Sequence, residues 1–268
     1  MSRDDAVRIE SESADGVLRI VLDRPAAKNA LTPAAVRAII EALEGAARDD
    51  ALRAVLVASA GPDFCAGADV VSANAAGQER PRPGRLQRRT ALEAHRLVEL
   101  LTTVQLPVVC AVRGAAAGLG CQLALAADFT VAADTATFWE PFIARGFTPD
   151  SGASWLLPRL VGVARARELL LLGEKLSGAR AAEWGMIHRA VPDADLDGAA
   201  EELVSRLAQG PTVALGLAKT TLQSGLTLSL TETMAKEALA LELSVRSEDF
   251  REGLAAFRER RKPEFKGR

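Results

Sequence analysis

The sequence predicts an α/β protein with a sheet in its first two thirds and helices in its last third. Short apolar runs, such as 54–58 and 107–111, are typical of buried strands. A segment of helical periodicity at 34–47 precedes the first of these runs, and the order strand, helix, strand predicts crossover connections. From residue 164 onward the pattern is helical apart from 186–191. We therefore expect a sheet-bearing core followed by helices that cover it or pair with another subunit.

The N-terminal part begins with strands and then reaches the first helix. Its expected elements are a hairpin over 7–11 and 16–23, a basic loop over 23–30, a helix over 34–47 and a buried strand over 54–58. Thr32 and Pro33 mark the start of the helix, because a threonine side chain caps free backbone N–H groups and proline is tolerated in the first turn. Residues 76–89 are polar, basic and rich in proline and glycine, which predicts a loop.

The remaining elements follow from periodicity and from helix-ending residues. A helix over 90–104 ends before Pro107, since the residue preceding a proline disfavours helix. The others are strands over 107–111, 129–132, 136–138 and 186–191, a helical turn over 140–144, and helices over 154–160, 164–172, 177–183, 196–208, 212–224, 228–244 and 247–258.

A glycine-rich turn over 112–122 joins an apolar strand to an apolar helix. Gly114, Gly118 and Gly120 let another backbone or a ligand approach closely, and the free N–H groups of a helix start favour negative charge. The glycine spacing does not fit a dinucleotide-binding fingerprint, and no Gly-Lys-Ser/Thr sequence closes a phosphate loop. Taken alone, this turn is compatible with a structural role as well as with a ligand site.

A second turn of small residues, over 61–71, follows the strand at 54–58 and also leads into a helical segment. Two such turns can each donate one backbone N–H to a single carbonyl oxygen. A fixed pair of donors stabilises negative charge that develops on that oxygen. The sequence thus predicts a candidate oxyanion site.

Composition excludes several classes of function. The chain has 268 residues, a net charge of −2 and a pI near 5.9, which argues against a nucleic acid or an anionic membrane as the main partner. No apolar stretch is long enough to span a membrane, and the first residues do not read as a secretion signal. Three scattered cysteines and two histidines favour a reduced, cytoplasmic protein without a metal site.

Several motifs resemble the enoyl-CoA hydratase/isomerase, or crotonase, superfamily when they are taken in order. They are Phe-Cys-Ala-Gly-Ala-Asp at 64–69, Gly-Ala-Ala-Ala-Gly-Leu-Gly-Cys at 114–121, Gly-x-x-Pro-Asp-Ser-Gly at 146–152, Leu-Pro-Arg-Leu-Val-Gly at 157–162 and Ser-x-Asp-Phe-x-Glu-Gly at 247–253. The resemblance implies a crotonase-type spiral of ββα units in residues 1–195, which binds acyl-CoA and carries catalysis. A helical region, 196–268, would then form a homotrimer or a dimer of trimers.

The same resemblance implies a site for an acyl-CoA thioester. Its carbonyl oxygen would lie between the backbone N–H groups of Ala68 and Leu119. The residues expected along the substrate and its CoA are Arg24, Lys28, Ala30, Ala66, Asp69, Val70 and Phe142. CoA enters as part of the substrate, and no further cofactor is expected. For Arg24 and Lys28 the alternative is an ordinary solvated charge.

Proton transfer is expected to fall to Asp150. Family hydratases place glutamates where this chain has Gln122 and Phe142, and neither side chain transfers protons as a carboxylate does. An aspartate at the Asp150 position takes and returns the proton in family isomerases, and the flanking Pro-Asp-Ser-Gly sequence looks most like the isomerases of phenylacetate degradation. The resemblance thus favours an enoyl-CoA isomerase that works through a thioester enolate. The alternative is that Asp150 only caps the following helix.

Three other functions stay open. Glu140 would revive hydratase activity if it reached the acyl group, although helical spacing turns it to another face. Asp150 together with His95 matches the residue pair of 4-chlorobenzoyl-CoA dehalogenases, which implies aryl-CoA dehalogenation or hydrolysis. His95 is equally well explained as a packed helix residue. The last alternative is a member that binds acyl-CoA without turnover.

Overall fold

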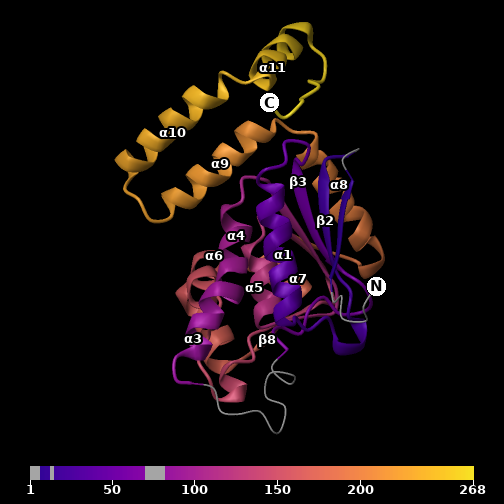
Figure 1. Cartoon of the computed structure of the whole chain (residues 1–268), viewed down its shortest axis with the longest axis vertical. Coiled ribbons are helices and arrows are strands. Elements are labelled where there is room, and N and C mark those ends of the chain that lie inside the picture. The colour runs from indigo at the N-terminus through magenta and orange to yellow at the C-terminus, as the bar shows by residue number, and fades with distance from the viewer. Residues whose placement is uncertain (1–6, 13–14, 70–81) are drawn as a thin grey trace.

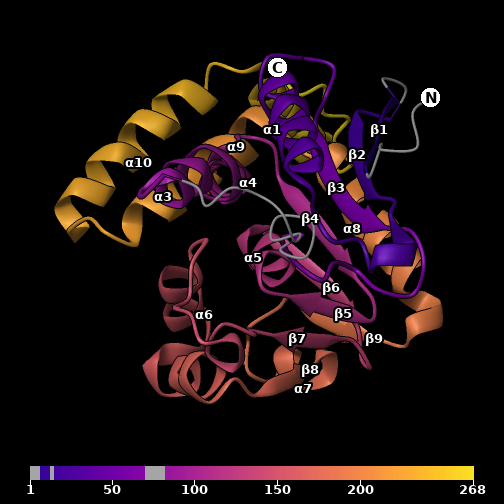
Figure 2. The ribbon, with the colours of Figure 1, turned by 60° about the horizontal axis from the view of Figure 1, so that its bottom comes forward.

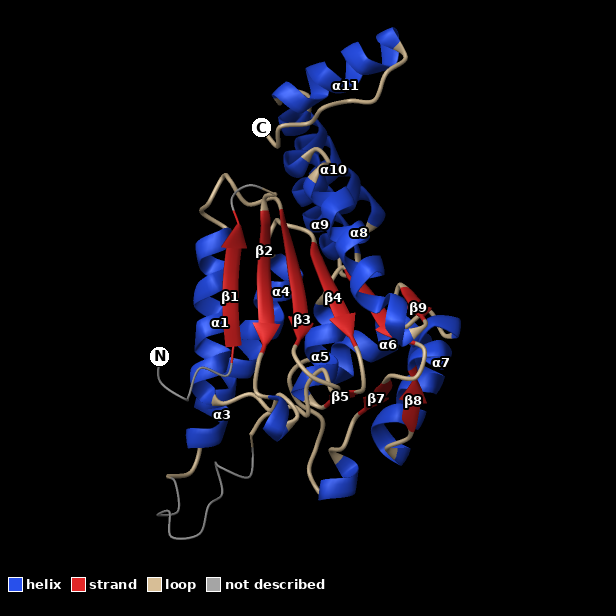
Figure 3. Cartoon of the chain, turned by 90° about the vertical axis from the view of Figure 1, so that its right-hand side faces the viewer, coloured by secondary structure: helices blue, strands red, loops and turns tan. Residues whose placement is uncertain are grey.

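The computed structural model describes residues 7–12, 15–69 and 82–268. A six-stranded sheet runs through it in the order β1-β2-β3-β4-β6-β9 (Figure 3). Its strands are β1 (Val7–Glu12), β2 (Val17–Leu22), β3 (Ala54–Ser59), β4 (Val108–Val112), β6 (Phe129–Ala133) and β9 (Arg189–Val191). Only the β1–β2 hairpin pair is antiparallel, and the other pairs are parallel. The parallel pairs need the crossover connections that the sequence predicts.

A smaller sheet of three strands, with order β5-β7-β8, lies beside the carboxyl ends of the large one (Figures 2 and 3). Its strands are β5 (Ala115–Ala117), β7 (Thr137–Trp139) and β8 (Lys175–Ser177). The sequence interpretation missed β5 and β8, because three consecutive alanines carry no strand periodicity and a strand of three residues is too short to show one. Pairing with β7 on either side makes them strands.

The helices account for most of the remaining chain. They are α1 (Pro33–Ala46), α3 (Arg85–Thr90), α4 (Arg96–Thr103), α5 (Leu119–Ala126), α6 (Ala153–Arg167), α7 (Gly178–Glu183), α8 (Leu196–Ala208), α9 (Thr212–Gly225), α10 (Leu230–Ser244) and α11 (Glu248–Glu259). The predicted cap of α1 is confirmed, since the Thr32 side chain accepts a hydrogen bond from the Ala35 N–H at 3.1 Å.

Two helical predictions need correction. The helix expected over 90–104 begins earlier, at Arg85, because Gly84 in a left-handed conformation (φ 79°) ends the preceding turn. A turn of π-helix, Ala91–His95, joins α3 to α4. The helices expected over 154–160 and 164–172 form α6 and a π-helical turn, Glu168–Leu172, and Gly162, which is non-helical with a positive φ of 77°, separates the two halves of α6. No helix in the described part of the chain is both long and apolar enough to cross a membrane.

Helices cover both faces of the large sheet. On one face, α1, α4 and α5 contribute buried side chains such as Ile39, Leu101 and Leu123 to the main core. On the other face, α8 packs Leu196 and Val204 against the strands in a second apolar cluster. The part that stands away from the sheet therefore begins after α8, with the α9–α10 pair and α11 (Figure 1).

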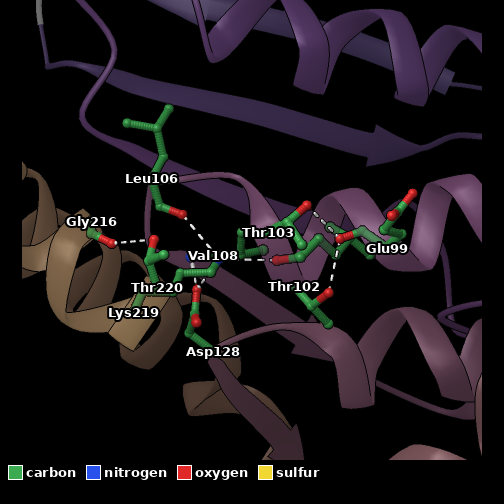
Figure 4. A network of polar contacts seen from close by, with 10 residues as sticks. Glu99, Thr102, Thr103, Leu106, Val108, Asp128, Gly216, Lys219 and Thr220 are labelled. Carbon is green, nitrogen blue, oxygen red and sulfur yellow. Dashed lines mark hydrogen bonds and ion pairs between the residues drawn. The ribbon is translucent and has the colours of Figure 1, made fainter. Parts of the chain in front are cut away.

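A buried lysine ties α9 to the sheet (Figure 4). Lys219 Nζ donates to the carbonyl oxygens of Leu101 and Leu106 at 2.9 and 3.2 Å, and to Asp128 Oδ2 at 2.6 Å. The same Asp128 oxygen accepts the Val108 N–H at 2.8 Å, at the start of β4. Burial lowers the pKa of Lys219 and raises the pKa of Asp128, against the effect of their pairing. One side chain thus anchors the projecting helices.

Replacing Lys219 with methionine is expected to lower the free energy of unfolding by about 3 kcal/mol, because Asp128 and two carbonyl groups lose their donor. Chemical denaturation measures the change. A control, Lys262→Met in the exposed segment after α11, is expected to stay within roughly 0.5 kcal/mol of the wild type. Equal stability of the two variants would mean that the tether contributes nothing.

Candidate active site

The two small-residue turns lie against each other. The Cys65 N–H donates to the Ala115 carbonyl at 2.8 Å, and the Ala117 N–H returns a bond to the Cys65 carbonyl at 2.9 Å. Gly67 and Gly120 make this approach feasible. A Cβ on residue 67 would lie 2.7 Å from the Ala117 oxygen, and a Cβ on residue 120 would lie 2.3 Å from the Cys65 oxygen. Two turns that are far apart in sequence are thus joined side by side by backbone hydrogen bonds.

Leu119 is the first residue of α5, and its N–H is one of the free donors of a helix start. Gly118 precedes it with a positive φ of 51°, offers no side-chain cap, and donates its own N–H to the Trp139 carbonyl at 2.9 Å. A Cβ on Gly67 would lie 3.4 Å from the Leu119 nitrogen. The Leu119 N–H therefore emerges beside the turn that carries Ala68.

The N–H of Ala68 points away from the neighbouring segment, which carries Leu31. It forms a parallel bridge with Leu31, whose N–H donates to Gly67 and whose carbonyl accepts from Asp69, at 2.8 and 2.9 Å. In such a parallel bridge, both hydrogen bonds of Leu31 go to the residues on either side of Ala68. The N–H of Ala68 itself therefore points to the side away from Leu31. Among the described residues this N–H makes no backbone hydrogen bond.

The loop before α1 runs along the first turn, and a residue that the sequence interpretation missed holds it there. Asn29 is buried, and its Nδ2 donates to the carbonyls of Ala60 and Asp63 at 2.9 and 2.7 Å. Its Oδ1 accepts the Arg24 N–H at 2.7 Å. Asn29 and Lys28 both have positive φ, which asparagine tolerates better than most residues. An asparagine in a short basic loop was the available signal.

The residues of this region that are expected to bind CoA lie together. The charged groups of Arg24 and Lys28 differ in how far they are free to contact a ligand. Arg24 pairs with Asp69 at 2.7 Å, and its side chain is about one third exposed. Lys28 is 67% exposed and lies 3.6 Å from Asp63. The Ala66 N–H donates to the Lys28 carbonyl at 2.9 Å, and the Ala30 carbonyl faces the Arg24 guanidinium at 3.5 Å. Val70 lies outside the described residues.

Asp150 stands at the start of α6 with an exposed side chain. Its carboxylate makes no hydrogen bond or ion pair with any part of the chain that the structure describes, and the helix cap is Gly152. Only its carbonyl takes part in the helix start, by accepting the Ala153 N–H at 3.0 Å. Ser151 is buried with a positive φ of 50°, so the backbone beside Asp150 is held in a strained conformation. The capping role is thus absent.

Two residues that were expected near the acyl group, Phe142 and His95, differ in how far they are buried. Phe142 is buried and packs edge-on against Phe147, with ring centroids 5.5 Å apart. His95 is exposed on the π-helical turn before α4. His95 lies three residues before Val98 in the chain. A Cβ on Gly152 would lie 3.5 Å from the Val98 side chain, so α4 lies beside the residues that precede α6.

Glu140 points into the interior of the protein. It follows β7, is 2% exposed, and accepts hydrogen bonds from Gln122 Nε2 at 3.0 and 3.1 Å, one to each carboxyl oxygen. Burial raises the pKa of Glu140 to about 8, with a smaller opposing effect from the Cys121 thiol and a reinforcing one from the charge of Asp150. The sequence interpretation did not foresee that Gln122 and Glu140 form a pair.

Comparison with known proteins identifies the family. The model of the enoyl-CoA hydratase/isomerase family matches residues 12–268. The chain belongs to this family. It is 40% identical to the 1,2-epoxyphenylacetyl-CoA isomerase of Escherichia coli K12 over 97% of its length and 98% of that protein's. It is also 40% identical to a probable enoyl-CoA hydratase of Rhodobacter capsulatus, with the same coverage. The crystal structure of the enoyl-CoA hydratase from Bacillus anthracis superposes with a TM-score of 0.90 at 30% identity, covering 98% of this chain and all of that one.

Family membership confirms the predicted fold class and an enzyme that acts on acyl-CoA. It leaves the reaction open, because similar relatives carry the names of an isomerase and of a hydratase. Among the described residues no group of three or more histidine, cysteine, aspartate or glutamate side chains is placed to hold a metal ion. The reaction has to be argued from the side chains around the two turns.

Proposed function

We propose that the chain is an enoyl-CoA isomerase that shifts a double bond of its acyl group, with Asp150 as the acid/base. The observation that carries this proposal is the free carboxylate of Asp150. The positions that bear glutamates in family hydratases hold Gln122 and Phe142 instead, and the nearby Glu140 is buried against Gln122. Asp150 is therefore the carboxylate most available to exchange protons with a substrate.

The proposed reaction moves one proton between two carbons. Asp150 removes a proton from C2 of a 3-enoyl thioester, and the electron pair spreads over the thioester as an enolate. The N–H groups of Ala68 and Leu119 hold the enolate oxygen, which lowers the energy of the charged intermediate. Asp150 then returns the proton to C4, and the product is the 2-enoyl isomer. No atom is gained or lost.

The test is incubation of the protein with a short 3-enoyl-CoA in deuterated water, followed by chromatography and mass spectrometry. Conversion to the 2-enoyl isomer without addition of water supports the proposal. A product heavier by one water would make the chain a hydratase instead. Recovery of unchanged substrate would move aryl-CoA chemistry through Asp150 and His95, or binding without turnover, ahead of isomerisation.

Lys28 is proposed to contact the phosphates of CoA, because it is the more available cation of the loop before α1. Replacement by alanine is expected to raise KM for an acyl-CoA about three- to tenfold, the range of a partly solvated charge contact. KM for the matching acyl-pantetheine, which lacks the nucleotide, should not change. Lys262→Ala, in the exposed segment after α11, serves as the control, and an equal effect on both substrates would contradict this role.

The helices after α8 are proposed to form the trimer contact expected from the family. Their exposed apolar side chains include Leu222, Leu226, Leu230, Met234, Leu239, Leu241 and Leu243. A monomer rarely leaves so many large apolar groups in water. Sedimentation analysis distinguishes a trimer from a dimer of trimers and from a monomer.

A further inference from the structure

A buried carboxyl and a buried amide face each other behind the two turns. Gln122 is fully buried and Glu140 is 2% exposed. The amide nitrogen of Gln122 reaches both carboxyl oxygens, at 3.0 and 3.1 Å. The amide oxygen of Gln122 is buried as well, and it has no hydrogen-bond partner among the described residues. The pair is thus left with one acceptor that lacks a donor.

A proton on Glu140 removes this deficiency. A protonated carboxyl has one O–H donor and one C=O acceptor, and a primary amide has the complementary N–H and C=O groups. A rotation about the terminal torsion of Gln122, which is a soft torsion, pairs both groups at once. An ionised Glu140 has no hydrogen to offer, so the amide oxygen then stays unpaired.

The pair lies against the turn that carries Leu119. Gln122 is three residues after Leu119 in α5, and residues at this spacing share a helix face. Glu140 directly follows Trp139, whose carbonyl accepts the Gly118 N–H at 2.9 Å. A shift of the pair would therefore be passed to the backbone that presents the Leu119 N–H.

We propose that Glu140 is a positioning residue that carries a proton in the working enzyme and locks the Gln122 amide behind the Leu119 turn. The inference rests on the proposed function, since it assigns to Glu140 a role in a reaction that forms a negative charge at this turn. Loss of the proton would break the hydrogen bond from Glu140 to the Gln122 amide oxygen. It would also place a buried carboxylate near both the enolate and the Asp150 carboxylate.

The surroundings of Glu140 favour the protonated form. The titratable groups that act on it are the Cys121 thiol of α5 and the Asp150 carboxylate before α6. The other side chains that share its small interior pocket are uncharged: Phe138, Trp139, Leu157, Leu169 and Met186. Lys175 and Arg145 lie over the Trp139 ring, at 4.8 and 6.0 Å from its centroid. Burial raises the pKa of Glu140 to about 8, so the proton is lost as the pH rises through that value.

The test compares pH profiles of kcat for the wild type, Glu140→Gln and Glu140→Leu. Wild-type kcat is expected to fall above about pH 8, by about tenfold per pH unit once Glu140 is mostly ionised. Glu140→Gln keeps both hydrogen bonds without titrating, so it should match the wild type near pH 7 within about threefold and lose this decline. Glu140→Leu should lower kcat at least about tenfold with little change in KM. Glu174→Gln, an exposed site, is the control.

An infrared difference titration without substrate provides a readout that does not depend on turnover. The C=O band of a protonated carboxyl is expected to disappear as the pH rises through about 8, and to be absent from Glu140→Gln. Absence of this band from the wild type, or an alkaline decline of kcat that persists in Glu140→Gln, would overturn the proposal. So would a Glu140→Gln variant as inactive as Glu140→Leu. A failure of the isomerase assignment would leave the infrared result unchanged, so the two failures are distinguishable.

Discussion

Replacing Asp150 with asparagine is expected to lower kcat for double-bond migration by about 10³-fold or more, because the amide cannot accept and return the proton. Acyl-CoA affinity should stay within roughly tenfold, since binding rests mostly on other contacts. The side chain is exposed and makes no hydrogen bond or ion pair within the described ranges, so the substitution removes the carboxylate without removing a structural contact.

Single-turnover kinetics and equilibrium binding of a non-reactive acyl-CoA separate these two effects. Asp134→Asn is the matched control, because Asp134 is also exposed but lies in the turn between β6 and β7. It should retain wild-type kcat. Full activity of the Asp150→Asn variant would refute the assignment of Asp150 as the base and would direct attention to Glu140 and His95.

Leu119→Pro is expected to lower kcat by about 10²- to 10³-fold, the effect of losing one donor of an oxyanion pair. Proline deletes the backbone N–H that is proposed to hold the enolate oxygen. Residue 119 is the first of α5, and proline is tolerated at that position of a helix because its N–H has no partner within the helix. The substitution therefore removes the donor and leaves the helix intact.

Leu119→Ala is the control, because it removes the same buried side chain and keeps the N–H. Its kcat should stay within about tenfold of the wild type. Both variants are compared at matched substrate saturation, with circular dichroism to verify the helix content. Equal kcat values for the proline and alanine variants would show that the Leu119 N–H does not act on the reacting oxygen.

Much of the fold could be predicted from local pattern. The strands with continuous apolar runs, the capped helix α1 and the C-terminal helices are found close to where periodicity and turn residues put them. The wrong predictions concern short segments whose secondary structure depends on a neighbouring segment. They are β5, β8 and the earlier helix start at Arg85. Three-residue strands are defined by pairing, which is a property of two segments and leaves no period in either one.

The candidate site shows the same division between chemistry and arrangement. Residue types alone indicated that Gln122 and Phe142 cannot transfer protons and that Asp150 can. The order of motifs indicated the family, which the comparisons confirm. The sequence could not tell whether Asp150 caps a helix, because that depends on where its carboxylate lies, and in the structure the cap is Gly152.

By itself the sequence determined the class of the fold, the family and the kinds of side chain available to an acyl-CoA substrate. The tertiary structure decided which of them meet. Asn29 and the Gln122–Glu140 pair join segments that are far apart along the chain. The physical reason is that hydrogen bonding and desolvation depend on which groups share a buried space, and those groups come from segments that local periodicity does not relate.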